Sequence, residues 1–324
     1  MPASGPLSPV SVIMPVRDEE RYLADAVRSV LGQDYPGELE VVLAVAPSTD
    51  RTEQVAAALA AADPRVQVVP NPAGHTPAGL NAAIEASRHE VVVRMDGHGA
   101  MSPGYLSRAV AVLEETGAAN VGGVMLAEGQ TPFEQAVAAA LRSPLGIGGA
   151  RFHVGGRPGP AKSVYLGVFR RDWLRRVGGY DPAYRRAQDW EMNYRIRQQG
   201  GTVWFDPGLS VSYRPRPSLR ELARQQFRTG QWRRRLVRQY PASVNYRYLA
   251  PPLLVVGLAG SLVGGLRWRP LWLLPAAYAA TVTVGGAATG ARHGPQVAAR
   301  TPLVMATMHL AWGTGFLLPA REDG

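Results

Sequence analysis

An aspartate and a histidine stand at the end of one apolar run. Residues 91–95 are rich in valine, as in a buried strand, and Asp96-Gly97-His98 includes the next three positions. A divalent cation bound together with phosphates takes only one or two protein ligands and keeps several waters. Asp96 and His98 are therefore candidate ligands of Mg²⁺ or Mn²⁺. A strand-end aspartate also commonly caps a turn or a helix, so this pair alone does not decide between the two roles.

A second carboxylate, Asp189, stands where a helix is predicted to begin. The helical pattern from Asp189 ends before Gly200-Gly201, because glycine just after the last helical residue favours helix termination. Asp189 would cap this helix, a role that contributes about 1 kcal/mol. It could also act as a general base, because the helix dipole keeps a carboxylate ionised there. The two roles are compatible.

Strand and helix signals alternate through the first third of the chain. Apolar runs predict strands at 10–16, 39–45, 66–69 and 91–95, with helices between them at 22–33, 52–62 and 77–86. Such alternation indicates an α/β fold with a mostly parallel central sheet and helices on both faces. Ligands of these sheets bind at the carboxyl ends of the strands. The chemically active residues are expected there.

The net charge of +10 is concentrated in one segment. Residues 214–238 contain nine arginines and one acid, Glu221, a net charge of +8. Three segments without a charged residue follow, at 249–266, 271–291 and 301–320. About 20 apolar residues cross a bilayer core. A basic strip beside such segments predicts contact with an anionic lipid surface and no nucleic-acid partner. We expect two or three hydrophobic membrane helices; the alternative is a buried helical domain.

These features predict three parts: an α/β domain at 1–213, a basic amphipathic membrane-interface segment at 214–248, and a membrane region at 249–324. The positive-inside tendency predicts that the α/β domain lies on the cytoplasmic side of the cell membrane. No signal peptide is predicted. The absence of cysteine from the 324 residues excludes a disulfide scaffold and a thiol nucleophile. The sequence does not indicate an oligomeric state.

Seven short motifs lie along the chain, at 12–20, 40–50, 79–83, 96–98, 165–171 with 177–181, Asp189, and 226–232. In this order they resemble the motifs of inverting family 2 glycosyltransferases, which have a GT-A fold. Each motif is weak alone, and their shared order carries the resemblance over roughly residues 10–235. The layout is also similar to that of bacterial exopolysaccharide glucosyltransferases of the succinoglycan type.

The resemblance implies transfer of a hexose from a nucleotide-diphosphate sugar to a hydroxyl of a lipid-linked or polysaccharide acceptor, in cell-envelope or exopolysaccharide synthesis. It implies that Asp189 is the catalytic base and that Asp96 and His98 hold Mg²⁺ or Mn²⁺. It also implies a set of residues that bind the nucleotide sugar: Pro15, Arg17, Asp18, Glu19, Asp50, Asn81 and Asp96. A second implied set contacts the acceptor or the diphosphate: Gly167, Arg170, Gln188, Arg228 and Trp232. Arg228 and Trp232 could equally anchor the chain at the membrane interface.

Some positions depart from the family pattern. Val45 and Ala46 stand where the family usually has an aspartate pair that recognises uracil, so the nucleotide base stays open. Asp18 replaces an asparagine of the first loop. Gln188 replaces the glutamate before the catalytic aspartate.

Three alternatives remain. A polyprenyl-phosphate glycosyltransferase has an acceptor phosphate that is already ionised and needs no strong base. A processive polysaccharide synthase usually has more membrane spans. A non-catalytic membrane scaffold would bind nucleotide sugars without turnover.

Overall fold

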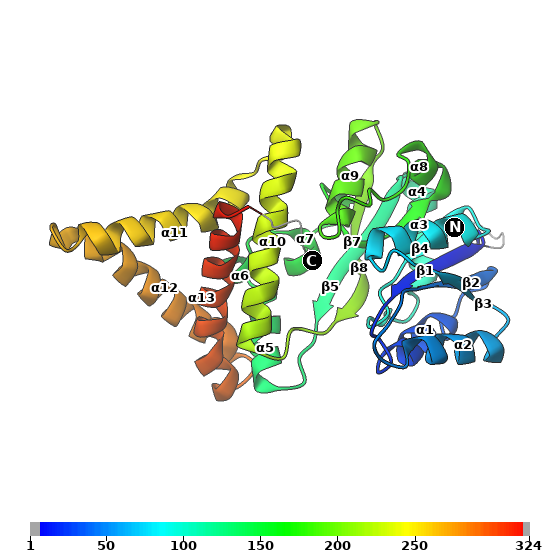
Figure 1. Ribbon diagram of the computed structural model, residues 1–324, viewed down its shortest axis with the longest axis horizontal. Helices are drawn as coiled ribbons and strands as arrows, with labels where there is room; N and C mark the ends of the chain where they lie inside the picture. Colours follow the sequence, from blue (N-terminus) through cyan, green and yellow to red (C-terminus); the bar gives the residue numbers. More distant parts are fainter. Residues whose placement is uncertain (1–6, 320–324) are drawn as a thin grey trace. The chain divides into compact units, whose positions relative to one another are not determined.

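The computed structural model describes residues 7–319, which form two compact units (Figure 1). The first unit extends to Leu126 and resumes at Gly155–Tyr213. The second unit combines Ala127–Val154 with the chain from Arg214 onward. Residues 127–154 therefore pack with the C-terminal part of the chain, an excursion that the predicted three-part division does not contain. That division stays a prediction.

The first unit begins with a parallel half-sheet in the order β3-β2-β1-β4. Its strands have valine-rich sequences, and β1, β2 and β4 are almost wholly buried because helices cover both faces. The predicted strands and helices of this half are confirmed to within two residues at each end. The elements are β1 (Val10–Val16), α1 (Leu23–Leu31), β2 (Leu39–Val45), α2 (Thr52–Ala62), β3 (Val66–Pro70), α3 (Thr76–Ala86) and β4 (Val91–Arg94).

The order of these strands creates a switch point. β1 pairs with β2 on one side and with β4 on the other, in parallel on both sides. Helices α1 and α2 lie on one face of the sheet and α3 lies on the other (Figure 1). In open α/β sheets, the crevice outside the carboxyl ends of the strands at such a point is the usual ligand site.

The second half of the sheet continues in the order β7-β5-β8-β6, and β7 is antiparallel to both β4 and β5. The chain thus has the GT-A-like α/β fold, with a mostly parallel central sheet, that the resemblance implied. The remaining elements of this unit are α4 (Tyr105–Thr116), β5 (Asn120–Ala127), β6 (Gly159–Pro160), β7 (Tyr165–Arg170), α8 (Arg171–Arg176), α9 (Gln188–Gln198) and β8 (Val203–Tyr213).

The second unit is helical and is built around α13 (Pro295–Leu317), which packs against α5, α10, α11 and α12. A Cβ atom at Gly230 of α10 would collide with the backbone of α13, and one at Gly315 of α13 would collide with that of α10. Glycine at both positions therefore lets these two helices approach closely. The other helices are α5 (Pro132–Leu141), α6 (Pro144–Ile147), α7 (Arg151–Val154), α10 (Leu219–Gln239), α11 (Tyr246–Gly264) and α12 (Leu273–Ala291), with short turns η1 (Pro241–Ser243) and η2 (Arg269–Trp272).

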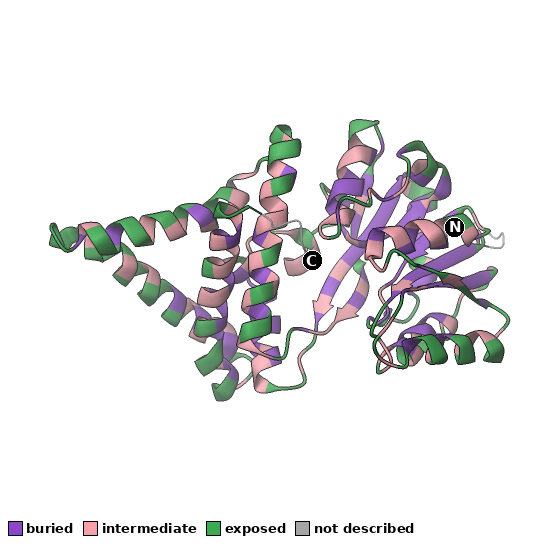
Figure 2. Cartoon of the chain, viewed as in Figure 1, coloured by how far each residue is buried: buried purple, intermediate pink, exposed green. Residues whose placement is uncertain are grey.

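Two segments in the described part of the chain are long and apolar enough to cross a membrane, Arg247–Gly264 and Arg269–Ala291. Most of their side chains are exposed, although many are apolar (Figure 2). Soluble proteins rarely expose so much apolar surface. The third predicted segment does not meet the same criterion: most of it lies in α13, which buries Met305 and Met308. Of the expected two or three candidate spans, the structure supports two.

Candidate active site

Asp96 and Asp189 meet at one guanidinium group. Arg94 is the last residue of β4, and its side chain is only 4% exposed. One terminal nitrogen, Nη2, donates a hydrogen bond to Asp96 Oδ1 at 3.0 Å. The other, Nη1, forms an ion pair with Asp189 Oδ1. Two carboxylates from distant parts of the sequence thus share one buried cation at the carboxyl end of β4.

Helix α9 carries Asp189 in its first turn, where the helix dipole favours a negative charge. Ala187, just before the helix, has a φ of 58°, a left-handed conformation that non-glycine residues rarely adopt. Arg195 anchors the helix: it pairs with Glu191 at 2.6 Å and donates to the carbonyl of Gly179 at 2.8 Å. This local order fixes where the Asp189 carboxylate points.

The loops that follow β1 and β2 are tied together at the same edge of the sheet. Asp18, with a φ of 55°, accepts a hydrogen bond from the backbone N–H of Thr49 at 2.7 Å. Asp50 accepts from the backbone N–H groups of Glu20 at 3.1 Å and Thr52 at 2.9 Å. Hydrogen bonds, chiefly from the Thr52 side chain, lower the pKa of Asp50. These two aspartates, both predicted to contact the donor, therefore hold the loops after β1 and β2 together.

Glu19 and His98 connect the loop after β1 to the loop after β4. His98 Nδ1 lies 2.6 Å from Glu19 Oε1. Gly97 permits this approach, because a Cβ atom there would be 2.9 Å from Val16 and 3.2 Å from Glu19. The predicted metal ligand His98 is thus paired with a predicted nucleotide-sugar residue.

The charge state of Asp96 suits a cation. Burial acts to raise the pKa of Asp96, but the positive charge of Arg94, with a smaller contribution from His98, outweighs it, and the pKa is lowered. An ionised carboxylate with an imidazole nearby fits the incomplete protein ligand set of Mg²⁺ or Mn²⁺ that is bound through a diphosphate. Within residues 7–319 no group of three or more acidic or histidine side chains could hold a metal ion by itself. The residues therefore fit a cation that arrives with its phosphate ligand.

Two other predicted site residues use their side chains to hold backbone. Asn81 donates to the carbonyl of Tyr180 at 2.7 Å and accepts from the Tyr180 N–H at 2.8 Å. Arg170 donates to the carbonyls of Ala118 at 3.2 Å and Leu113 at 2.9 Å. These bonds join α3 and β7 to neighbouring segments, and direct contact of either residue with a ligand stays a prediction.

The structure places the remaining predicted residues without assigning a role. Pro15 is half-buried in β1, and Arg17 is exposed and donates to the carbonyl of Gly74 at 3.1 Å. Gln188 opens α9. Gly167 lies directly opposite Arg94 in the β4–β7 pair, and a Cβ atom there would collide with the Phe169 ring at 2.5 Å.

Arg228 and Trp232 lie on α10 in the second unit. Arg228 is exposed, and the guanidinium of Arg235 stacks over the Trp232 ring at 5.1 Å. Contact of either residue with donor or acceptor stays a prediction.

Arg94 itself was not among the residues predicted from the sequence. A charged residue in a short, otherwise apolar strand was the signal, because a buried charge needs a charged partner. Burial opposes the charge on Arg94, but the neighbouring carboxylate of Asp96 outweighs burial and raises the pKa of the guanidinium.

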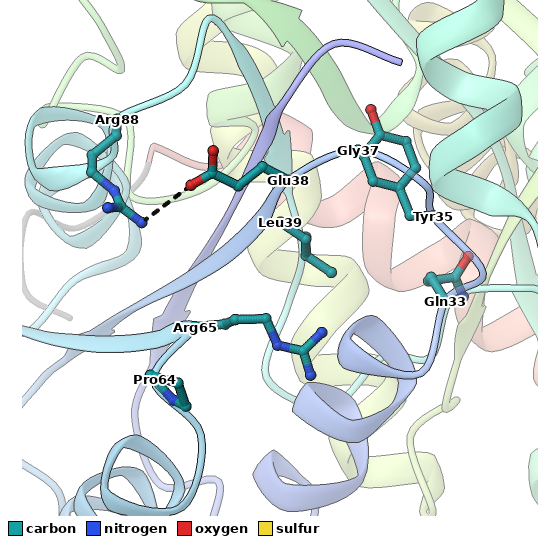
Figure 3. A pocket seen from close by; sticks show the side chains of 8 residues that line it. All are labelled: Gln33, Tyr35, Gly37, Glu38, Leu39, Pro64, Arg65 and Arg88. Atoms are coloured by element: carbon teal, nitrogen blue, oxygen red, sulfur yellow. Dashed lines mark ion pairs between the residues drawn. The ribbon is translucent and has the colours of Figure 1, made fainter. Parts of the chain in front are cut away.

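A cavity of about 330 Å³ lies at the amino end of β2 (Figure 3). Neither Asp96 nor Asp189 lines it. Its two arginines are already neutralised: Arg65 pairs with Asp63 at 2.8 Å, and Arg88 pairs with Glu40 at 2.8 Å. This cavity is therefore a poor candidate for a phosphate site. It is lined by Gln33, Tyr35, Gly37, Glu38, Leu39, Pro64, Arg65 and Arg88.

Comparison with known proteins agrees with this geometry. Residues 11–178, just over half of the chain, match the model of the family described as "Glycosyl transferase family 2". The chain belongs to glycosyl transferase family 2.

The similarity to curated relatives extends beyond residues 11–178. This family 2 glycosyltransferase is 29% identical to the succinoglycan biosynthesis protein ExoA of Rhizobium meliloti (strain 1021), over 94% of this chain and 93% of that protein. It is 21% identical, over 68% of this chain and 71% of the other, to a protein of Methanococcus voltae. That protein is named dolichyl N-acetyl-alpha-D-glucosaminyl phosphate 3-beta-D-2,3-diacetamido-2,3-dideoxy-beta-D-glucuronosyltransferase. One relative is thus named for succinoglycan biosynthesis, and the other is named as a glucuronosyltransferase with a dolichyl-linked sugar phosphate in its name.

Among solved structures, the chain is similar to a mannosyltransferase, PcManGT from Pyrobaculum calidifontis, solved in complex with GDP-Man and Mn²⁺. The TM-score is 0.61 at 20% identity, and the match covers 96% of this chain and 86% of that one. At this identity the similarity shows a shared fold.

Proposed function

We propose that this family 2 glycosyltransferase is a membrane-associated inverting enzyme that moves a hexose from a nucleotide-diphosphate sugar to a hydroxyl of a lipid-linked or polysaccharide acceptor. One observation carries the proposal: Asp96 and Asp189 meet at the buried guanidinium of Arg94, at the carboxyl edge of the sheet. A cation-binding carboxylate and a base need this proximity if they are to act on one reacting pair.

The chemistry follows from the two carboxylates. Asp189 takes the proton from the acceptor hydroxyl while the oxygen of that hydroxyl bonds to the anomeric carbon of the donor. The bond from that carbon to the diphosphate breaks on the opposite side, so the configuration inverts and a nucleoside diphosphate leaves. Asp96, with His98 beside it, would hold Mg²⁺ or Mn²⁺, which neutralises charge on the leaving diphosphate.

The class of acceptor rests on the relatives. One is named for succinoglycan biosynthesis, and another for transfer to a dolichyl-linked sugar phosphate. Both names describe large or lipid-carried glycans, which supports a role in cell-envelope or exopolysaccharide synthesis. The nucleotide of the donor stays open because Val45, the last residue of β2, and Ala46 after it carry no carboxylate.

Membrane association rests on the second unit. Arg220, Arg224, Arg228, Arg235 and Arg238 are exposed on α10, while Leu222, Gln226 and Gly230 of the same helix are buried. Exposed arginines suit anionic headgroups, and α11 and α12 carry the apolar surface that a bilayer would cover. By the positive-inside tendency the first unit would lie on the cytoplasmic side.

The test uses the full chain solubilised in detergent. UDP-, GDP- and dTDP-hexoses are screened with Mn²⁺ for an increase in melting temperature, and then for sugar transfer or donor hydrolysis. We expect one nucleotide class to stabilise the protein in a metal-dependent way. Asp96→Asn should lose the metal dependence, whereas Asp63→Asn, the same change at the other end of the sheet, should keep it. Failure of every donor to bind, with or without Mn²⁺, would contradict the proposal.

A further inference from the structure

Arg94 contacts both residues to which the proposed reaction assigns a role. Its Nη2 donates to Asp96 Oδ1 at 3.0 Å, and its Nη1 pairs with Asp189 Oδ1. A guanidinium is planar and rigid, so two carboxylates on its two terminal nitrogens have a defined separation and orientation. A lysine ammonium, a point charge on a flexible stem, would not impose that geometry.

The surroundings leave this guanidinium little freedom to move. Arg94 is 4% exposed, whereas the side chains of Asp96 and Asp189 are each 23% exposed. The fully buried ring of Tyr180 lies near the guanidinium, and α9 is held in place by its own Arg195. The cation therefore faces the protein interior, and the carboxylates can reach a ligand.

Charge balance supplies a second reason for an arginine here. Two carboxylates beside an incoming diphosphate would repel it and each other, since all of these groups are negative. The guanidinium offsets one of those charges from below without occupying the space that the donor and acceptor need.

From this geometry we infer that Arg94 is a positioning residue, whose guanidinium fixes the base Asp189 at a set distance and angle from the cation-binding Asp96. This inference rests on the proposed function for the roles of the two aspartates. Arg94 itself would touch neither substrate. Its contribution is to keep the base and the cation site in register through the reaction.

The kinetic test compares Arg94→Lys and Arg94→Met with the wild type in the full-length, solubilised protein. Both variants should lose about 10²-fold in kcat, because a base displaced by about 1 Å misses the acceptor hydroxyl. The KM for the donor should change by less than about threefold. Millimolar guanidinium added to Arg94→Ala should restore about tenfold of the lost kcat, since a free guanidinium can occupy the vacated volume.

The matched control is Arg108→Met. Arg108 pairs with the buried Asp206 through Nη2 at 2.9 Å, in the same unit but between α4 and β8. Its loss should lower the melting temperature and leave kcat unchanged, with no response to guanidinium. If Arg94→Met loses no more kcat than Arg108→Met, or if guanidinium restores nothing, the inference is wrong.

A measurement without substrate separates this inference from the proposed function. Arg94→Met leaves Asp189 beside an apolar side chain, so the melting temperature should fall by roughly 5–10 °C. Adding Asp189→Asn should recover part of that fall, because one of the two carboxylates left without Arg94 is then neutral. An inactive wild type would overturn the proposed function, whereas independent, additive effects of the two substitutions would overturn the link between Arg94 and Asp189.

Discussion

The two ends of the parallel half-sheet both hold carboxylates against arginine, but the burial is reversed. At the amino ends, Glu40 is 4% exposed and its partner Arg88 is 65% exposed. At the carboxyl ends, Arg94 is 4% exposed, while Asp96 and Asp189 are each 23% exposed. At the amino ends the protein buries the glutamate of the pair, and at the carboxyl ends it buries the arginine.

The difference separates a structural pair from a chemical one. Glu40 accepts hydrogen bonds from Ser11 Oγ at 2.6 Å and from the backbone and side chain of Arg88 at 2.6 and 2.8 Å. Such a carboxylate is fully used in joining β1, β2 and the chain before β4. Asp96 and Asp189 are held on their interior side by the buried guanidinium of Arg94, and both remain partly accessible to a ligand. A buried guanidinium in contact with two partly exposed carboxylates is therefore the feature that distinguishes the candidate active site.

The largest expected effect is at Asp189. Asp189→Asn keeps the shape of the side chain and removes the proposed base, so kcat should fall by about 10²- to 10⁴-fold with the donor KM nearly unchanged. Steady-state kinetics with a hydroxyl acceptor measure this. The matched substitution at the other end, Glu40→Gln, should leave kcat at the wild-type level. Full activity in Asp189→Asn would instead favour a phosphate acceptor, as in a polyprenyl-phosphate glycosyltransferase.

The next largest effect is at Glu40 and concerns stability instead of catalysis, because Glu40→Gln should lower the free energy of unfolding. Replacing the carboxylate weakens three charge-assisted hydrogen bonds, which we expect to lower the free energy of unfolding by about 1–3 kcal/mol. Glu38→Gln is the control, since Glu38 is 62% exposed and lies 3.9 Å from the same arginine. Denaturant unfolding of the two variants should show a loss only for Glu40→Gln. Equal loss in both would contradict a structural role specific to Glu40.

The Glu40 contribution should also depend on pH. Burial acts to raise the pKa of Glu40, but hydrogen bonds from Ser11 and Arg88 outweigh it and lower the pKa below the ordinary value of 4.5. A carboxylate with a lowered folded-state pKa contributes stability above its unfolded pKa, and that stability is lost as pH falls through the folded value. The stability difference between wild type and Glu40→Gln should stay constant from pH 6 to 8 and shrink below about pH 4.5. A difference that persists unchanged in acid would contradict this.

Much of this comparison was readable from the sequence. Valine-rich runs predicted the strands of the parallel half-sheet, and the rule that ligands bind at the carboxyl ends of such strands indicated Asp96. Asp18 and Asp50 were implied by the resemblance to family 2 glycosyltransferases. The order β4-β7-β5 was not readable, because antiparallel pairing between distant strands leaves no local pattern. Nor was the departure of residues 127–154 from the first unit, since an alanine-rich helix packs equally well on a sheet or on other helices.

Side-chain roles were the least predictable. Asn81 and Arg170 carry the polar groups expected of ligand contacts, but hydrogen bonds to backbone engage both. Arg94 was not predicted as a site residue, because an arginine at the end of a strand usually lies at the protein surface, as on the uncovered edge of a sheet. Only the fold shows that β7 covers that edge, so that the charge is buried and requires Asp96 and Asp189 as partners.

The smallest expected effect compares two half-buried aspartates, Asp50 and Asp63, which play similar local roles at opposite ends of the parallel half-sheet. Asp50 ties the loops after β1 and β2 through the N–H of Glu20 at 3.1 Å, and Asp63 ties its own turn through the N–H of Arg65 at 2.9 Å. Asp50→Asn weakens this tie at the crevice, so the donor KM should rise by about three- to tenfold with kcat and melting temperature nearly unchanged. Asp63→Asn should change neither kinetic constant. If both variants raise the KM, or neither does, the loop tie at the carboxyl end does not preorganise the donor site, and the two ends differ only in the Arg94 cluster.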